Sequence, residues 1–351
     1  MSGDTAAHHA TCNLQRALTQ ADLRIDTVQV AARIEAAIRD QVFSRLKRRG
    51  VVVGLSGGID SSVVAALSAR AVGADRVLGL FMPEADSADD SLRLGRLLAN
   101  ALGIPTVLEE IGPILTAAGC YRRRDEAIRQ VLPEYGPGYR CKIVHSDILK
   151  QDGYAIYSVV AESPSGERRQ ARMTAAAYLG VVAATSFKQR TRKMMEYYHA
   201  DRLQYAVAGT PNLLEYDQGF FVKNGDGAAD IKPIAHLYKT QVYQLAAYLD
   251  IPAEIQGRPP TTDTYSLPQS QEEFYFSLPY DQMDLCLYGK NHAIALAEVA
   301  EATGLTPHQV ERVFRDIDAK RAATRPLHMP PLLVEAPSHK ERGAECGKGV
   351  G

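Results

Sequence analysis

The stretch that decides the fold is VVVGLSGGIDSSVVAALSAR, residues 51 to 70. It opens with three β-branched residues, continues through small residues with one carboxylate, and ends in an apolar helical pattern. A short apolar, β-branched run is typical of a buried parallel strand. We therefore predict a strand over residues 51–55, a glycine-rich turn, and a helix over residues 60–72.

The alternation of strand and helix continues along the chain. RVLGLFMP (76–83) predicts the next strand and IPTVLEEI (104–111) a third one. Between them, Ser87 and Asp90 have the spacing of a capping box, which predicts a helix that reaches about Leu102. This order is typical of an α/β protein with a doubly wound parallel sheet. In front of the sheet, an apolar residue at every fourth position predicts one amphipathic helix over residues 28–49, ended by Gly50.

The alternation of strands and helices stops over residues 112–172. YRCKIVHSD (139–147) and YAIYSVVAES (154–163) read as antiparallel strands, and SPSGE (163–167) as a turn before RRQARM. We interpret this region as an inserted β-hairpin. It carries three arginines and two tyrosines that could form a solvated basic surface, a dimer contact, a substrate lid or a docking surface: Arg122, Arg123, Arg124, Tyr135 and Tyr139.

The α/β pattern then resumes. We predict a helix over 175–198, the strand LQYAVAG (203–209), a helix from Tyr238, and two C-terminal helices over 292–303 and 306–321. The loop GRPPTTDTYSLPQSQEE (257–273) is too long for an ordinary connection, which indicates a functional role. We expect an N-terminal extension (1–27), one domain with C-terminal helices (28–335), and a disordered tail (336–351).

Composition narrows the class of protein. Of the 351 residues, 46% are hydrophobic and 23% charged, as in folded soluble proteins. A net charge of −1 gives no general attraction to nucleic acid. The sequence has no membrane-spanning run and no signal-peptide core, so we expect a cytoplasmic protein. The five cysteines are scattered without a CxxC pair, which favours reduced, structural thiols.

The SGGIDSS turn has the chemistry of a phosphate site. In an open α/β sheet, ligands bind beyond the carboxyl ends of the strands, where helix N-termini present free N–H groups. Gly57 and Gly58 allow a close backbone approach, and Ser56, Ser61 and Ser62 supply hydroxyl groups. No Lys follows, so this is not the GxxxxGK[ST] loop. The carboxylate of Asp60 would repel phosphate unless a divalent cation lay between them; alternatively Asp60 is simply a helix N-cap.

A second cluster of polar residues follows a later strand, in AVAGTPNLLEYDQGFFVKNGDGAADIKPIAHLYKTQV (206–242). Thr210 follows the strand end, and Glu215 could join Asp60 on a magnesium ion. Taken singly, Lys223, Asp230 and Lys239 could each be a solvated surface charge. Together their spacing predicts separate contacts from a folded loop and a helix start.

These motifs carry a family resemblance. SGGIDSS resembles the pyrophosphate-binding SGGxDS loop of the N-type ATP pyrophosphatase superfamily. The spacing from Thr210 through Glu215, Lys223, Asp230 and Lys239 to Thr261 in PPTTD resembles that of the NAD synthetase family. FKQRTRKM (187–194) is similar to the family helix motif NxKARxRM, which places Arg190 where the family has a substrate-contacting arginine.

The resemblance implies a ligase that adenylates the nicotinate carboxylate of deamido-NAD with ATP, releases pyrophosphate, and lets ammonia displace AMP. It implies Mg²⁺ on Asp60 and Glu215, catalytic roles for Asp60 and Lys239, and contacts of Arg190, Lys223 and Asp230 with deamido-NAD. It also implies a homodimer in which neither nucleic acid nor membrane is a partner. The implied ATP site comprises Gly54, Leu55, Ser56, Gly57, Gly58, Ile59, Asp60, Ser61, Ser62, Thr210, Lys239 and Thr261.

The chain departs from the family pattern on the substrate side. Pro211 follows Thr210, Val222 replaces the usual Thr before Lys223, and RPLHMPP (325–331) replaces a His-Lys pair. An amide ligase of the same scaffold that adenylates another carboxylate is therefore an alternative. A tRNA-modifying ATP pyrophosphatase would be expected to show a strong basic face and often paired cysteines, and neither is evident. A nucleotide sensor could keep the SGG loop but would not need both Asp60 and Glu215. The short segment before the first helix cannot supply a glutaminase domain, so we expect free ammonia or a separate glutaminase subunit.

Overall fold

The computed structural model describes residues 17–145, 156–261 and 264–335. The expected disordered tail and most of the N-terminal extension lie outside these ranges. Four parallel strands form the central sheet, in the order β3-β2-β1-β7. The chain moves outward from β1 to β3 and then returns to the other side of β1, so the predicted doubly wound topology is confirmed. The strands are β1 (Val51–Gly54), β2 (Val77–Phe81), β3 (Thr106–Leu108) and β7 (Ala206–Ala208).

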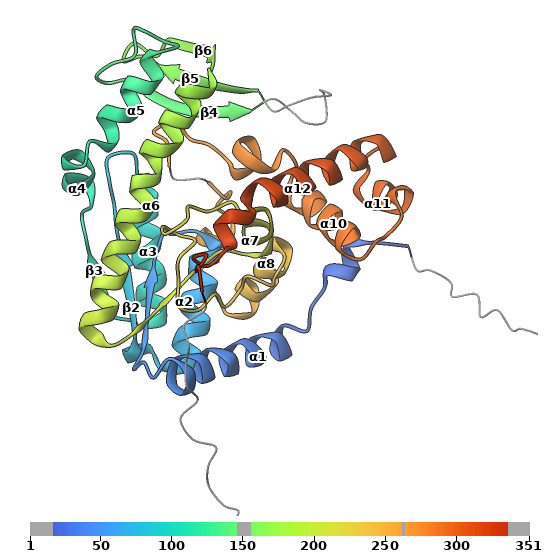
Figure 1. Ribbon diagram of the computed structural model, residues 1–351. Coiled ribbons are helices and arrows are strands. Elements are labelled where there is room, and N and C mark those ends of the chain that lie inside the picture. Colours follow the sequence, from blue (N-terminus) through green and yellow to red (C-terminus); the bar gives the residue numbers. More distant parts are fainter. Residues whose placement is uncertain (1–16, 146–155, 262–263, 336–351) are drawn as a thin grey trace, which may run out of the picture.

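Helices cover both faces of this sheet (Figure 1). Because side chains alternate along a strand, Val51 and Val53 face one layer of helices and Val52 faces the other. The first layer consists of α1 (Thr27–Arg39), α2 (Ile59–Val72), α3 (Asp89–Leu102) and α8 (Lys239–Tyr248). The second layer contains α4 (Gly112–Ala117), α5 (Cys120–Arg129) and the 29-residue helix α6 (Ala175–Leu203).

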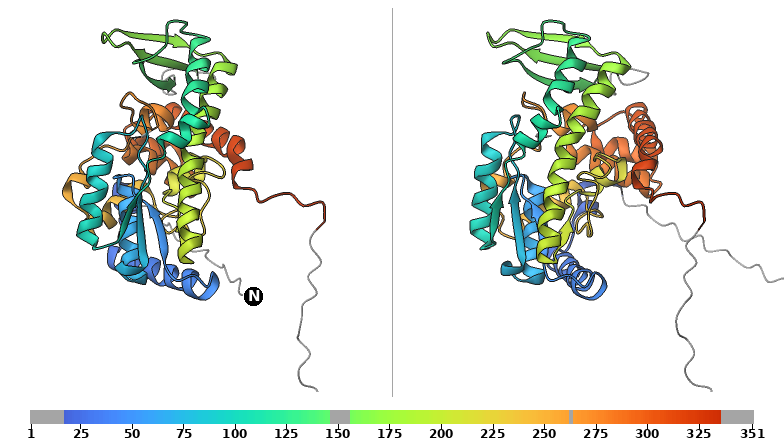
Figure 2. Two further views of the ribbon diagram at one scale, coloured as in Figure 1. Left: turned by 90° about the vertical axis from the view of Figure 1, so that its left-hand side faces the viewer. Right: turned by 60° about the vertical axis from the view of Figure 1, so that its left-hand side comes forward.

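The inserted region forms a second sheet. Strands β4 (Arg140–His145), β5 (Tyr157–Glu162) and β6 (Arg168–Arg172) are antiparallel and neighbour one another in that order. The hairpin expectation is confirmed, but α4 and α5 were not predicted. Figures 1 and 2 show this sheet at the N-terminal end of α6, away from the parallel sheet.

The C-terminal part is helical and packs around a separate apolar cluster. The two predicted helices are present as α11 (Leu296–Thr303) and α12 (Pro307–His328), and α10 (Tyr280–Asn291) was not predicted. Short elements complete the chain: α7 (Leu213–Gln218), α9 (Ala253–Gln256), two short turns of 3-10 helix, η1 (Gln20–Leu23) and η3 (Ala74–Arg76), and two π-helical segments, η2 (Asp40–Arg45) and η4 (Glu272–Phe276).

Several expected helix boundaries were wrong, since α6 reaches Leu203, α11 begins only at Leu296 and α12 reaches His328. Two others have a clear local cause. Helix α1 passes into the π-helical η2 and stops at Leu46, since Lys47 takes a positive φ of 54°. Gly50 instead allows a close approach, because a Cβ there would lie 2.3 Å from the carbonyl oxygen of Arg76. Helix α3 has Ala88 as its N-cap, and the hydroxyl of Ser87 accepts a hydrogen bond from the Glu84 N–H at 3.1 Å. The capping-box spacing therefore marked a turn before the helix.

Within the described ranges, none of the helices is long and apolar enough to cross a membrane. Three cysteines lie in the described part of the chain, Cys120, Cys141 and Cys286, and all three are free and buried. Their burial is typical of structural thiols, and Cys12 and Cys346 lie outside the described residues.

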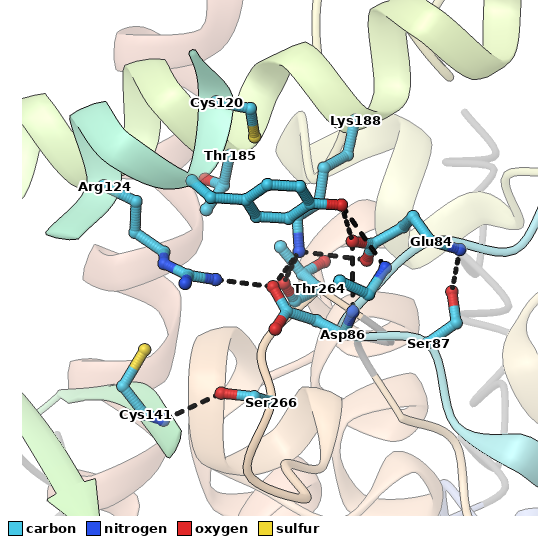
Figure 3. Close-up of polar contacts among 12 residues, drawn as sticks. Glu84, Asp86, Ser87, Cys120, Arg124, Cys141, Thr185, Lys188, Thr264 and Ser266 are labelled. Atoms are coloured by element: carbon cyan, nitrogen blue, oxygen red, sulfur yellow. Dashed lines mark hydrogen bonds and ion pairs between the residues drawn. The ribbon is translucent and has the colours of Figure 1, made fainter. Parts of the chain in front are cut away.

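A buried ion cluster ties the inserted region to the parallel sheet (Figure 3). Lys188 of α6 is fully buried, and its Nζ lies 3.0 Å from Glu84 Oε1 and 2.6 Å from Asp86 Oδ2, both after β2. Arg124 of α5 contacts the same Asp86 oxygen at 2.5 Å. Tyr121 of α5 donates its hydroxyl to Glu84 at 2.8 Å. These buried charges therefore link helices α5 and α6 to the loop after β2.

Replacing the central cation of this cluster should destabilise the fold. Lys188→Met leaves two buried carboxylates without their ammonium partner, which costs about 3–5 kcal/mol of unfolding free energy. Chemical denaturation measures this loss. The exposed pair of Arg122 with Glu126 is the control, since Arg122→Met should cost less than about 1 kcal/mol. Equal losses in the two variants would contradict a structural role for the cluster.

Candidate active site

A cavity of about 450 Å³ opens at the carboxyl ends of β1 and β2. This is the edge where the strand order reverses between β1 and β7, the usual ligand position of an open α/β sheet. Most of the predicted ATP-site residues line it, and so does Glu215. Those residues are Gly54, Leu55, Ser56, Gly58, Ile59, Asp60, Ser61, Thr210, Lys239 and Thr261.

The two remaining residues of the predicted ATP site shape the turn from behind. Gly57 has a φ of +72°, and a Cβ there would lie 2.6 Å from the carbonyl oxygen of Ser91. Only glycine adopts this conformation in so little space. Ser62 is buried and donates its hydroxyl to the Gly58 carbonyl at 2.8 Å. Gly57 and Ser62 therefore support the loop, while Ser56 and Ser61 face the cavity.

Asp60 is not the N-cap of α2. Gly58 occupies that position, and Asp60 lies in the first turn. Its Oδ2 forms an ion pair with the Nζ of Lys239, the first residue of α8. Its Oδ1 accepts a hydrogen bond from the side-chain amide of Asn212 at 3.1 Å. The capping alternative is thereby wrong, and the carboxylate is held in the cavity by two partners far away in the sequence.

Asn212 also holds Glu215. The two residues form a capping box at the start of α7, in which the Asn212 N–H donates to Glu215 Oε2 at 3.1 Å and the Glu215 N–H donates to Asn212 Oδ1 at 3.2 Å. The other carboxylate oxygen accepts from the side chain of Gln271 at 3.1 Å. One asparagine therefore links the two predicted metal ligands, Asp60 and Glu215.

The electrostatics of the site keep Lys239 charged. Its side chain is fully buried, which lowers the pKa of an ammonium, but the carboxylates of Asp60 and Glu215 outweigh burial and raise the pKa of Lys239. For Glu215, in contrast, burial outweighs the neighbouring positive charge. Burial and the nearby charge of Asp60 raise the pKa of Glu215 to about 8, although Lys239 acts to lower it.

Asp284 of α10 orients the start of α8. Its two carboxylate oxygens accept hydrogen bonds from the Lys239 N–H at 3.2 Å and the Thr240 N–H at 2.7 Å. A carboxylate at a helix N-terminus satisfies free N–H groups and interacts favourably with the helix dipole. Burial nevertheless raises the pKa of Asp284 to about 6. The position of Lys239 therefore depends on a helix that the sequence pattern did not reveal.

The three predicted substrate residues do not line the cavity. All three are exposed. Arg190 donates to the carbonyl of Lys223 at 3.3 Å, and Lys223 donates to the carbonyl of Pro326 in α12 at 2.8 Å. Asp230 accepts from the Val207 N–H at 2.8 Å. The structure brings Arg190 and Lys223 together near the end of α12, whereas the neighbouring side chains of Gln189, Arg192 and Val222 reach the cavity.

Sequence reasoning missed Asn212, Gln271 and Asp284. Asn212 could have been found, because Asn212 and Glu215 have the Asn-x-x-Glu spacing of a capping box. Gln271 lies in the loop expected to be functional, but no local pattern distinguishes it from its polar neighbours. Asp284 acts across two helices, so its role is visible only in three dimensions.

Removing the buried carboxyl of Glu215 should change how stability depends on pH. A carboxyl whose pKa is raised on folding stabilises the protein below its ordinary pKa, and that contribution is lost as pH rises through the folded value. The unfolding free energy of wild type minus that of Glu215→Gln should therefore fall between pH 4.5 and about 8, by at most about 1.4 kcal/mol per pH unit.

Denaturation in the absence of divalent cations, at a series of pH values, measures this difference. Glu162→Gln is the control, because hydrogen bonds from Arg140 and Arg168 lower the pKa of Glu162. Its difference from wild type should show no fall across the same window. A flat profile for Glu215→Gln would contradict the raised pKa.

Comparison with known proteins identifies the family of this chain. A sequence model of the NAD synthase family matches residues 30–131 and 157–323. The NH₃-dependent NAD⁺ synthetase of Rhizobium rhizogenes is 60% identical over 323 residues, covering 92% of this chain and 97% of the relative. The protein of that name from Thermotoga neapolitana is 35% identical over 271 residues, covering 77% and 85%.

Solved structures show the same fold at lower identity. The NMN synthetase of Francisella tularensis has a TM-score of 0.62 at 21% identity, covering 88% of this chain and 99% of that one. The NH₃-dependent NAD synthetase of Campylobacter jejuni has a TM-score of 0.57 at 22% identity, covering 89% and 100%. The carboxylate of Asp60 in α2 and the ammonium of Lys239 in α8 meet in one cavity at the strand edge, and the matches cover most of the chain, which belongs to the NAD synthase family.

Proposed function

We propose that this protein is an ATP-dependent amide ligase that converts deamido-NAD to NAD. The nicotinate carboxylate attacks the α-phosphorus of ATP, pyrophosphate leaves, and ammonia then displaces AMP from the adenylated intermediate. The observation that carries the proposal is the convergence of Asp60, Glu215 and Lys239 on the N-terminus of α2 in a chain of this family.

The residues of the cavity suit nucleotidyl transfer, in which positioning and charge neutralisation supply most of the catalysis. The free N–H groups at the start of α2, with the hydroxyls of Ser56 and Ser61, would hold the β- and γ-phosphates. Thr210 and Thr261 lie on other walls of the same cavity and would complete the ATP site. Lys239 carries a buried positive charge and would stabilise the charge that develops at the α-phosphate.

Asp60 and Glu215 fit a Mg²⁺ site. Mg²⁺ is commonly bound by one or two carboxylates together with substrate phosphates, and these two carboxylates lie against the phosphate loop. Burial and the neighbouring charge of Asp60 raise the pKa of Glu215, and a cation bound between the two carboxylates would favour the ionised form. Bound there, the cation would offset the charge of the leaving pyrophosphate.

Several further parts of the proposal concern partners. Arg190, Lys223 and Asp230 would contact deamido-NAD. All three are exposed, and the position of Arg190 and Lys223 near the end of α12 is compatible with a site beside a subunit boundary. A homodimer is supported by the exposed apolar side chains on α6, with Leu179, Met194 and Tyr198 at 61%, 52% and 57% exposure.

We place this reaction in the cytoplasm, with free ammonia or a separate glutaminase as nitrogen source. Residues 28–335 would act as one catalytic domain with 112–172 inserted.

Asp60→Asn should abolish the reaction while the protein still folds. The substitution keeps the shape of the side chain but removes the charge that Lys239 and the predicted cation need, so AMP and pyrophosphate formation should fall at least about a hundredfold. Pyrophosphate release is measured with ATP, deamido-NAD and ammonium.

Asp318→Asn is the matched control, since Asp318 forms an exposed pair with Lys290 and should leave the rate unchanged. Circular dichroism checks that both variants remain folded. Turnover by Asp60→Asn equal to wild type would refute the role of Asp60. Wild-type pyrophosphate release that deamido-NAD does not stimulate would refute the proposed acceptor and favour another carboxylate.

A further inference from the structure

The inserted sheet borders the active site through one of its edges. Strand β4 pairs with β5 on one side only, so its other edge is free of sheet partners within the described residues. Residues 264–273 run along that edge. The Leu267 N–H donates to the Cys141 carbonyl at 3.0 Å, and the Cys141 N–H donates to Ser266 Oγ at 2.9 Å. Figure 3 shows the contact between Cys141 and Ser266.

Side chains extend this contact in both directions. Lys142 Nζ lies 2.6 Å from Glu273 Oε1, and the side-chain amide of Gln269 donates to the Ile143 carbonyl. Tyr265 is buried in the apolar cluster of the inserted sheet. We call this contact between β4 and residues 264–273 the β4 seam.

The Thr264 end of the segment is held by the buried ion cluster. Lys188 donates to the Thr264 carbonyl at 2.7 Å, in addition to its pairs with Glu84 and Asp86. In Figure 3 the Thr264 carbonyl points into this cluster. The segment is therefore fixed to α6 at its start and to β4 along its length.

The other end of the segment reaches the predicted metal ligand. Gln271 donates to Glu215 Oε1 at 3.1 Å, and the Tyr280 hydroxyl donates to the side-chain carbonyl of Gln271. Thr264, Tyr265 and Gln271 line the cavity, and Ser270 forms an isolated bridge with Thr261. Most of the segment has no regular secondary structure, and such a stretch has low local stability unless other elements bind its backbone.

From these contacts we infer that the inserted region is a positioning element for the active site. Strand β4 fixes residues 264–273, so that Gln271 orients the Glu215 carboxylate and Thr261 stays at the cavity wall. Lys142 is a positioning residue in this scheme, since it acts through Glu273 and touches no substrate. The inference rests on the proposed function in one respect, namely that Glu215 takes part in the reaction.

A charge-reversal cycle on the full chain tests the β4 seam. Lys142→Glu and Glu273→Lys each place like charges in contact, and the double variant restores an opposite pair. Each single variant should speed amide hydrogen exchange in the peptide containing residues 264–271 and raise the KM for ATP about three- to tenfold, with a smaller change in kcat. The double variant should return both values to within about twofold of wild type.

Two further variants separate positioning from general stability. Ser266→Ala removes the acceptor of the Cys141 N–H and should shift exchange and KM in the same direction as the charge variants. Arg169→Glu breaks the pair of Arg169 with Glu134 in the same sheet but away from the seam, and should leave KM and exchange unchanged.

The inference is overturned if the single variants exchange like wild type at an unchanged KM, or if the double variant fails to recover. Equal changes in Arg169→Glu would also overturn it, because they would reflect the stability of the sheet alone. Hydrogen exchange is read without substrates, so its outcome is independent of the reaction. If hydrogen exchange is faster in the single variants and restored in the double variant while wild type forms no AMP with deamido-NAD, the result would support the β4 seam and contradict the proposed function.

Discussion

The candidate active site depends on the ion pair between Asp60 and Lys239. The aspartate comes from the first turn of α2 and the lysine from the first residue of α8, 179 positions later in the chain. Because Lys239 is fully buried, its charge requires a nearby anion. The pair therefore fixes the relative position of two helix N-termini, and Asn212 adds the start of a third helix through its bond to Asp60.

This convergence follows from the topology of the sheet. Helices α2 and α7 begin after the neighbouring strands β1 and β7, where the strand order changes direction. Their N-termini consequently open toward one cavity, and each carries a carboxylate in its first turn, Asp60 and Glu215. Burial and then the charge of Asp60 raise the pKa of Glu215, so the folded protein disfavours the ionised form of this carboxyl. The free energy of unfolding is therefore lower when Glu215 is ionised.

The sequence predicted those parts of the structure that have local causes. The strand, turn and helix of residues 51–72 were confirmed because β-branched residues, glycines and an apolar helix succeed one another there. Helices α5 and α10 were missed for different reasons. The arginines of α5 hide its apolar stripe, and α10 buries the consecutive residues 283–287, Asp284 among them, so its sequence shows no helical period. The prediction that Ser87 caps α3 was wrong, because the Ser-x-x-Asp spacing of a capping box also occurs where the serine closes a turn.

In the candidate site too, the sequence predicted the residues whose placement has a local cause and missed those that depend on tertiary packing. Residues adjacent to strand ends, such as Thr210 and Glu215, were found because their position in the chain implies their position in space. Asp284 and Gln271 act from elements whose placement depends on tertiary packing, so their bonds to the start of α8 and to Glu215 could not be predicted from the sequence. The three exposed residues Arg190, Lys223 and Asp230 stay a prediction, since their contacts within the chain are mostly with backbone groups.

Helix α6 imposes a condition on how this protein can vary in length. The helix has 29 residues and a length of about 44 Å, and it contacts the inserted sheet through Tyr178, the ion cluster through Lys188, and the region after β3 through the bond of His199 to Glu109. Adding or deleting one residue between these positions would rotate one part of the helix by about 100° against the other. The helical phase between Tyr178 and His199 is thus fixed, because a change of one residue between them would break at least one of the three contacts.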